Sequence, residues 1–185
     1  MQTTLTPLID PIQTLTPTPK PSLKRWWRQV FFIPCIHNRW LTQQAQAELS
    51  KAVSQAETGH RGEVFLVIEN TLPLHIARTQ DSRDRAVQVF SDYGVWDTAD
   101  NTGVLVYLNV CEHRLEIVAD RGINQHVLPT MWQAMCDKAL TQIKADKPVV
   151  GLVGLLDDIG QLLRQYYQQT DTAGNELSDT VVYLR

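Results

Sequence analysis

The sequence predicts an α/β fold in which a small central mixed β-sheet is sandwiched by helices, an α/β/α arrangement. Two short runs of apolar and β-branched residues, 63–69 and 103–110, are typical of buried strands, and a segment with helical spacing lies between them. An alternating run, 115–120, follows the second strand closely enough to be its hairpin partner. Two long amphipathic segments come next and can cover the faces of the sheet.

The composition is that of a soluble globular protein. The chain has 185 residues, of which 43% are hydrophobic and 20% charged, so one domain with tails can bury a sizeable core. The net charge of −3 gives no field that favours nucleic acid, and no nucleic-acid partner is expected. Three scattered cysteines without a C-x-x-C pair favour a reducing compartment over a disulfide framework. No signal peptide or membrane-spanning run is visible, so the expected location is cytoplasmic.

Two segments precede the expected domain. Residues 1–22 carry five prolines among many threonines and are expected to be a disordered tail. Residues 23–40 form a basic and aromatic lead segment that begins "LKRWWRQVFFIP". Such a segment can make peripheral membrane contact through residues 23–33. The alternative, which we favour on the sequence, is a first helix that docks its aromatic side chains on the domain.

The domain is expected over residues 41–168. A helix begins at Leu41 and stops at Gly59, and a second helix spans about 82–93. A third helix is expected over about 124–145. Its apolar side is expected to carry Leu128, Met131, Trp132, Met135 and Ala139.

A fourth helix begins at about Pro148, because proline is tolerated in the first turn of a helix. Its apolar face is expected to end with Leu162, Leu163 and Tyr166. Residues 169–185 form a C-terminal extension, in which "DTVVYLR" is a candidate edge strand.

Three polar loops are expected to meet at one end of the sheet. A strand–helix–strand unit is right-handed and places its two strands parallel, so both strands begin at the same end, and the antiparallel hairpin partner finishes there. The loops are "GHRGE", "WDTADN" and "ADRGIN". The polar side chains that they offer are His60, Arg61, Glu63, Asp97, Asp100, Asn101, Asp120 and Arg121. A nucleotide site is not expected, because ligands of doubly wound sheets bind at the carboxyl ends of the strands.

Three stretches, "TGHRGEVFLVIE", "VWDTADNTGVLVYL" and "EIVADRGI", resemble the TPM domain family over roughly 41–167, and are most similar to its bacterial branch. The resemblance implies a mixed sheet flanked by helices, a divalent-cation site and, for some members, a weak acid phosphatase activity. It also implies a protein partner, with a LemA-type membrane protein as the candidate, and a location peripheral to the inner membrane. The family's acidic loop falls on Asp97, Asp100 and Asn101, and its hairpin arginine on Arg114. Another branch has a glycine–tyrosine–glycine turn where this chain has Asp120, Arg121 and Gly122.

The loop residues allow several interpretations. Calcium or another divalent cation takes oxygen ligands, which Asp97, Asp100, Asn101 and Asp120 can supply. Alternatively, these are turn residues that bond their own backbone, and Arg61 and Arg121 neutralise them. His60 is either a base or a solvated loop residue. No nucleophile–base pair is visible, so the sequence favours a non-catalytic module for assembly or maintenance, with a weak metal-dependent acid phosphatase as the alternative.

Overall fold

The computed structural model describes residues 22–33, 38–168 and 180–184. The expected N-terminal tail, apart from Ser22, and most of the C-terminal extension therefore lie outside the described residues.

The sheet has four strands in the order β3-β2-β1-β4. Strands β1 (Glu63–Glu69) and β2 (Gly103–Asn109) are parallel neighbours with Val64 opposite Val104, and every residue of both strands is buried. Strand β3 (Arg114–Ala119) pairs antiparallel with β2, and the short strand β4 (Val182–Leu184) pairs parallel with the end of β1 at the sheet edge. The predicted mixed sheet is therefore confirmed.

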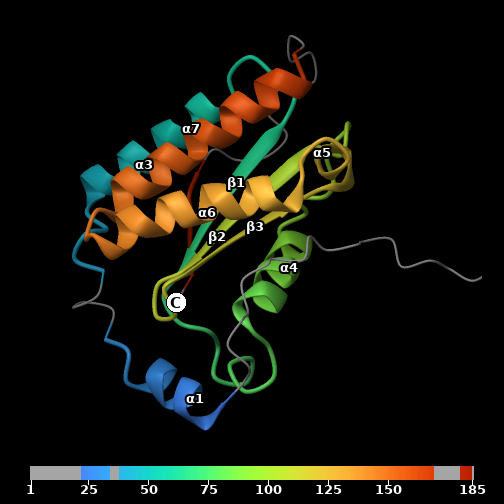
Figure 1. Ribbon diagram of the computed structural model, residues 1–185. Helices are drawn as coiled ribbons and strands as arrows, with labels where there is room; N and C mark the ends of the chain where they lie inside the picture. Colours follow the sequence, from blue (N-terminus) through green and yellow to red (C-terminus); the bar gives the residue numbers. More distant parts are fainter. Residues whose placement is uncertain (1–21, 34–37, 169–179, 185) are drawn as a thin grey trace, which may run out of the picture.

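Helices cover both faces of the sheet (Figure 1). One face carries α3 (Gln43–Ala56), α6 (Pro129–Lys144) and α7 (Pro148–Tyr166), which pack on alternate strand residues such as Leu66 and Val106. The other face carries α4 (Ser82–Asp92), which packs on the intervening strand residues. These strand residues are Phe65, Val67, Leu105, Tyr107 and Val118. The two-residue alternation of each strand thus supplies two separate cores.

The structure corrects the predicted third helix. Residues Arg121–Asn124 form a short helix, α5, and the long helix α6 begins only at Pro129. Proline fits the first helical position because its missing N–H has no partner there. As a result Leu128 lies before the helix and is 65% exposed, whereas the sequence places it on the apolar side. The buried side chains of α6 are Trp132, Cys136 and Ala139.

The structure also corrects part of the favoured interpretation of the lead segment: Phe32 packs against the core as expected, but other aromatic side chains do not. Helix α1 (Leu23–Val30) lies beyond the carboxyl ends of β1 and β2, at the lower end of Figure 1. Its buried residues are Arg25 and Gln29, whereas Trp27 and Phe31 are exposed. Within the described residues, no helix is both long and apolar enough to cross a bilayer.

Candidate functional site

The three predicted loops meet at the amino ends of β1 and β2, next to α5 at the upper end of Figure 1. We call residues 59–63, 96–102 and 119–124 the three-loop edge. The hydroxyl of Thr102 donates to the carbonyl oxygen of Arg61 at 3.0 Å and joins the first loop to the second. The backbone N–H of Gly122 donates to the carbonyl oxygen of Asn101 at 3.1 Å and joins the second to the third.

Gly122 allows the second and third loops to approach closely. A Cβ at this position would lie 2.4 Å from the carbonyl oxygen of Asn101 and 2.8 Å from that of Asp100. Asn101 itself has φ +55°, a left-handed conformation that asparagine adopts more readily than most residues. The close approach brings two backbone carbonyl oxygens next to the loop that carries Asp120.

Two arginines pair with the polar side chains of the edge. Arg61 donates to Asp100 at 3.2 Å, and their side chains are 33% and 41% exposed. Arg121 donates through Nε to Oδ1 of Asn101 at 3.3 Å. Guanidinium groups thus contact two of the four predicted cation ligands.

Asp120 is the predicted ligand whose carboxylate has one buried oxygen still available to bind an ion. Its Oδ1 accepts from the backbone N–H of Arg121 at 2.6 Å and caps helix α5. Its Oδ2 is buried and has no hydrogen-bond partner in the part of the chain that the structure describes. Such an oxygen is costly to bury unless something binds it. A hard carboxylate oxygen in a loop that lies against two backbone carbonyl oxygens fits a divalent cation.

Other predicted residues are placed differently. His60 is 2% exposed, so it is not a solvated loop residue. Its Nδ1 accepts from the N–H of Gly62 at 3.0 Å and its Nε2 contacts the carbonyl oxygen of Ala56, so both ring nitrogens bond the backbone and shape the turn before β1. Glu63 is buried as the first residue of β1.

Two further residues stand apart from these contacts. Asp97 is exposed, and the hydrogen bonds that join the loops within the described residues do not include its carboxylate. Arg114 begins β3 opposite Asn109 and therefore lies at the other end of the sheet.

Tyr167 is a member of the three-loop edge that the sequence did not indicate. It follows the last residue of α7, and its hydroxyl donates to the carbonyl oxygen of Gly122 at 2.5 Å. Partial burial, with a smaller contribution from the charge of Asp100, raises the pKa of Tyr167. Helical spacing places Tyr166 on the inner face, but Tyr166 is 38% exposed and stacks on His126.

The opposite end of the sheet holds a second polar cluster, which we call the buried network. Glu69, at the end of β1, accepts from Arg85 at 2.8 Å and from the hydroxyl of Tyr107. Asn109, at the end of β2, accepts from the N–H of Glu112 at 2.9 Å. The remaining members, which contact Glu112, are Arg25, Gln29 and Ser82.

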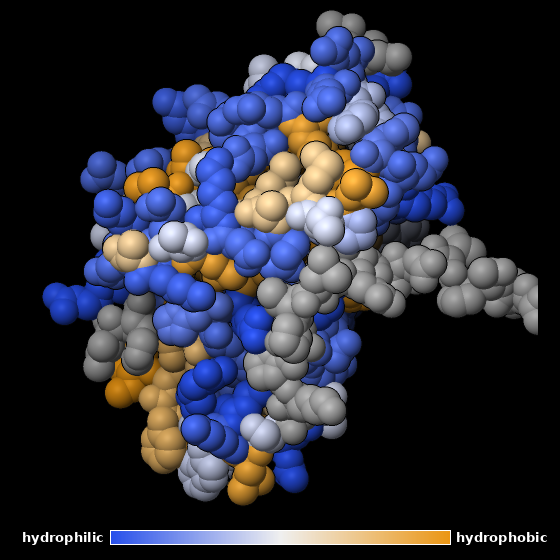
Figure 2. All heavy atoms as spheres, in the orientation of Figure 1, coloured by the Kyte–Doolittle hydropathy of each residue, from blue (hydrophilic) through white to orange (hydrophobic). Residues whose placement is uncertain are grey.

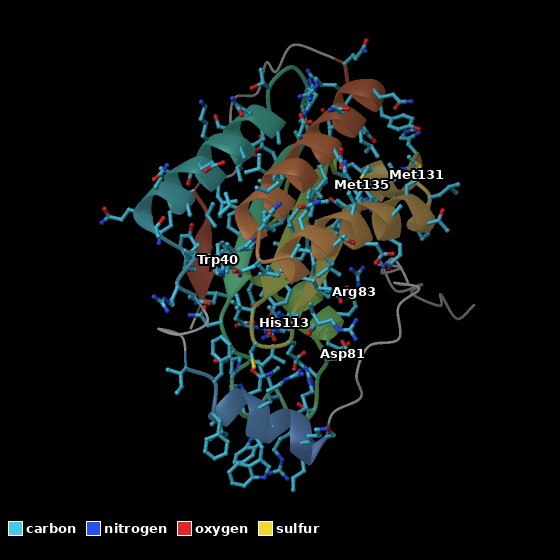
Figure 3. All side chains as sticks on the ribbon, turned by 60° about the vertical axis from the view of Figure 1, so that its left-hand side comes forward. Trp40, Asp81, Arg83, His113, Met131 and Met135 are labelled. Atoms are coloured by element: carbon cyan, nitrogen blue, oxygen red, sulfur yellow. The ribbon has the colours of Figure 1, made fainter. Side chains whose placement is uncertain are left out.

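A small cavity opens near the same end of the sheet, with a volume of about 90 Å³. Trp40 and His113, labelled in Figure 3, lie on two of its walls, and Leu108 and Ile143 also line it. Pockets for small molecules are usually about 300–1,000 Å³, so this cavity is too small to be such a site.

The candidate cation site cannot be made of acidic side chains alone. Across residues 22–33, 38–168 and 180–184, no three His, Cys, Asp or Glu side chains lie close enough together to hold a metal ion. A ligand set at the three-loop edge therefore needs the side chain of Asn101 and backbone carbonyl oxygens as well as carboxylates.

The fold and this edge define an α/β/α protein with charged loops at the amino ends of its parallel strands. The model of the TPM domain family matches residues 37–162, more than half of the chain, so the chain belongs to this family and the predicted resemblance is confirmed. The chain is also similar to the NMR structure of the BA42 protein from the psychrophilic bacterium Bizionia argentinensis, with 27% sequence identity and a TM-score of 0.68. The similarity covers 77% of this chain and 94% of BA42. No curated protein matches the chain significantly.

Proposed function

We propose that this TPM-domain protein is a non-catalytic interaction module that binds a divalent cation, calcium, at the three-loop edge and acts in assembly or maintenance at the cytoplasmic side of a membrane. The observation that carries the cation proposal is the buried Oδ2 of Asp120, which has no hydrogen-bond partner among the described residues. It lies in the loop that Gly122 brings against the carbonyl oxygens of Asp100 and Asn101.

The residues that would hold the ion are Asp100, Asn101 and Asp120, with water completing the six to eight oxygen ligands of calcium. Asp97 is a candidate for an outer, water-mediated contact because it is exposed in the same loop. A bound ion would supply positive charge that links the second and third loops. It competes with Arg61 for Asp100, since one oxygen of that carboxylate already accepts from the guanidinium group.

Thermal unfolding tests the cation proposal. Calcium that binds the folded loops and hardly binds the unfolded chain stabilises the protein by ~2.7 kcal/mol at about a hundred times the dissociation constant. Each kcal/mol raises the melting temperature by roughly 2–4 °C for a chain of this size. We therefore expect a rise of several degrees between chelator and excess calcium. Asp120→Asn should abolish the rise while it preserves the cap of α5, because asparagine caps helices as well as aspartate does.

Two controls make the result specific. Asp157→Asn removes an exposed carboxylate of α7 and should leave the calcium response unchanged. Sodium at matched ionic strength should not reproduce the effect of calcium. If sodium stabilises the protein as much as calcium does, screening of the carboxylates explains the shift and the cation proposal is wrong.

Apolar side chains beside the three-loop edge support an interaction role. Trp96 is 49% exposed in the second loop, and Leu128 is 65% exposed after α5. Exposed large apolar side chains that are surrounded by polar residues are typical of protein contacts. The expected partner is a LemA-type membrane protein. Co-purification of the two proteins that Trp96→Gln weakens would support this part of the proposal, and binding that is unaffected would contradict it.

A weak metal-dependent acid phosphatase is the second candidate. It is favoured by Arg61 and Arg121, whose guanidinium groups lie among the acidic oxygens and are suited to phosphoryl oxygens. We expect slow or no hydrolysis of generic phosphomonoesters by the purified protein. Fast turnover that Asp100→Asn and Asp120→Asn both abolish, without a change in melting temperature, would instead establish an enzyme.

A further inference from the structure

Helix α1 is amphipathic, but it is docked by its polar side. Arg25 donates to Glu112 at 3.0 Å and to the carbonyl oxygen of Ala77 at 3.2 Å. Gln29 donates to Glu112 at 2.7 Å and accepts from the N–H of Leu72 at 3.0 Å. Both side chains are buried, and so is their shared partner, since the Glu112 side chain is 0% exposed.

These contacts fix which side of α1 faces outward. A buried carboxylate that loses its cationic partner is strongly destabilised, so Glu112 holds Arg25 inward. Gln29 adds a second polar anchor one turn further along the helix. Charge and hydrogen bonding on one side of the helix therefore specify its orientation, and the other side faces outward.

The outward side carries the large apolar residues. Their spacing of four, seven and eight residues from the first places them on one helical face. We call them the α1 apolar face: Leu23, Trp27, Val30 and Phe31, which are 69%, 47%, 39% and 70% exposed. Trp27 and Phe31 stack with ring centroids 5.4 Å apart. Figure 2 shows apolar atoms gathered at the lower end of the molecule, over α1, and Figure 3 shows side chains of α1 that point away from the domain.

Positive charge accompanies the α1 apolar face. Lys24 and Arg28 are exposed on the same helix. Residues 11–47 contain five lysines and arginines, of which Arg25 is buried against Glu112, and no aspartate or glutamate, although the whole chain has a net charge of −3. The charge of this part of the chain is therefore opposite to that of the rest and complementary to an anionic surface.

We propose that the α1 apolar face binds in the interface of a bilayer that contains anionic lipids. Tryptophan is enriched at that depth, and a basic helix with an aromatic and aliphatic face lies flat there with its apolar side immersed. Binding of α1 in an apolar groove of a partner protein would explain the apolar residues equally well, but it does not account for the flanking cations. Docked in this way, the protein holds its three-loop edge at the far end, away from the lipid (Figure 1). This membrane contact rests on the proposed function of the protein as an interaction module. Its residues are separate from the cation site, so vesicle binding and calcium binding can fail independently.

Co-sedimentation of the full-length protein with lipid vesicles tests the proposal. We expect retention on vesicles of phosphatidylcholine mixed with phosphatidylglycerol at low ionic strength, and little retention on phosphatidylcholine alone. Raising the salt to about 1 M, where the Debye length is about 3 Å, should release part of the protein. Absence of binding to the anionic vesicles under both conditions would overturn the proposal.

Paired variants locate the contact. Trp27→Gln with Phe31→Gln should lower partitioning about tenfold or more, because the apolar area available for insertion is lost. The matched control is Trp96→Gln with Leu128→Gln, which removes equally exposed apolar side chains at the opposite end of the molecule and should leave partitioning unchanged. Lys24→Gln and Arg28→Gln should each lower it about fivefold. The control variant, the Trp27 and Phe31 variant and Lys24→Gln should keep the wild-type melting temperature, since these side chains are exposed. Arg28→Gln also loses a 3.7 Å contact with the buried Glu112, so its partitioning is compared with that of the wild type at a temperature where both are folded.

Two results would contradict the inference. Equal losses in the α1 variant and in the control variant would indicate non-specific adsorption. A wild-type dimer in sedimentation velocity that Trp27→Gln with Phe31→Gln converts to a monomer, together with no vesicle binding, would show that a second copy covers the α1 apolar face instead.

Discussion

The two ends of the sheet hold the same kind of ion pair in different surroundings. At the three-loop edge, Arg61 and Asp100 are 3.2 Å apart, with side chains 33% and 41% exposed. In the buried network, Arg85 and Glu69 are 2.8 Å apart, with side chains 12% and 1% exposed. Both pairs join a guanidinium group to a carboxylate, but the buried carboxylate also accepts from the hydroxyl of Tyr107, and the two pairs differ strongly in their access to water.

Because of this difference in exposure, the ion pair at one end of the sheet stabilises the fold, and the ion pair at the other end can be replaced by another ligand. An exposed pair contributes little because water and salt screen it, so either member can be taken by another ligand at low cost. A buried pair cannot be opened without leaving a charge in an apolar environment. We infer that the buried network fixes the loop after β1 and helix α1, whereas the three-loop edge can change its bonding when a ligand arrives.

The largest expected effect comes from opening the buried pair. Glu69→Ala leaves Arg85 and the hydroxyl of Tyr107 without their shared acceptor, and should lower the free energy of unfolding by about 3–5 kcal/mol. The matched change at the other end, Asp100→Ala, should cost only about 0.2–1 kcal/mol. Urea unfolding of both variants measures the two values. Similar losses would mean that burial does not distinguish the two ends.

A third ion pair, at the free edge of β3, tests the effect of burial through pH. Arg83 of α4, labelled in Figure 3, lies 3.8 Å from Glu116, whose side chain is 2% exposed. Burial raises the pKa of Glu116 to about 7, and the nearby charge of Arg83 only partly opposes this. The folded state therefore holds this proton more tightly than the unfolded chain, so its stabilising contribution is present below about pH 4.5 and is lost as the pH rises through 7.

Removal of the titrating group should flatten this pH dependence. Relative to the wild type, Glu116→Gln should gain up to about 3 kcal/mol of stability between pH 4.5 and 8, because it stays neutral throughout. Unfolding in urea at several pH values measures the difference. Parallel curves for the two proteins would show that Glu116 keeps an ordinary pKa and that burial at this edge has no electrostatic effect.

The sequence predicts those features of the fold that depend only on the local residue pattern and on the direction of the chain. The continuous apolar run of Val104 to Leu108 predicts a strand buried on both faces, and the structure has it between β1 and β3. The handedness of the strand–helix–strand unit predicts that the three loops meet, and hydrogen bonds from Thr102 and Gly122 join them. Both predictions need only the order of the elements.

Features that depend on a partner distant in sequence could not be predicted. The polar ends of β1 and β2 gave no sign that Glu69 would meet Arg85, or that Glu112 would meet Arg25 from a helix 87 residues earlier. The orientation of α1 follows from the second of these pairs, which is why the aromatic composition of the segment suggested the opposite docking. Tyr167 replaces Tyr166 because the chain leaves the helical conformation at that residue.

The smallest expected effect on stability is at Arg61, and it is also the most informative about the three-loop edge. Arg61→Ala removes an exposed pair and should lower the free energy of unfolding by less than about 1 kcal/mol, and by less still at high salt. If calcium binds where we propose, the same variant should bind it more tightly, since Asp100 no longer has to exchange a guanidinium group for the ion. Calorimetric titration of wild type and variant measures this change, and Lys138→Ala, which removes an exposed cation of α6 that pairs with Asp158, serves as the control. Weaker calcium binding in Arg61→Ala than in the control would mean that Arg61 orders the carboxylates for the ion and does not compete with it.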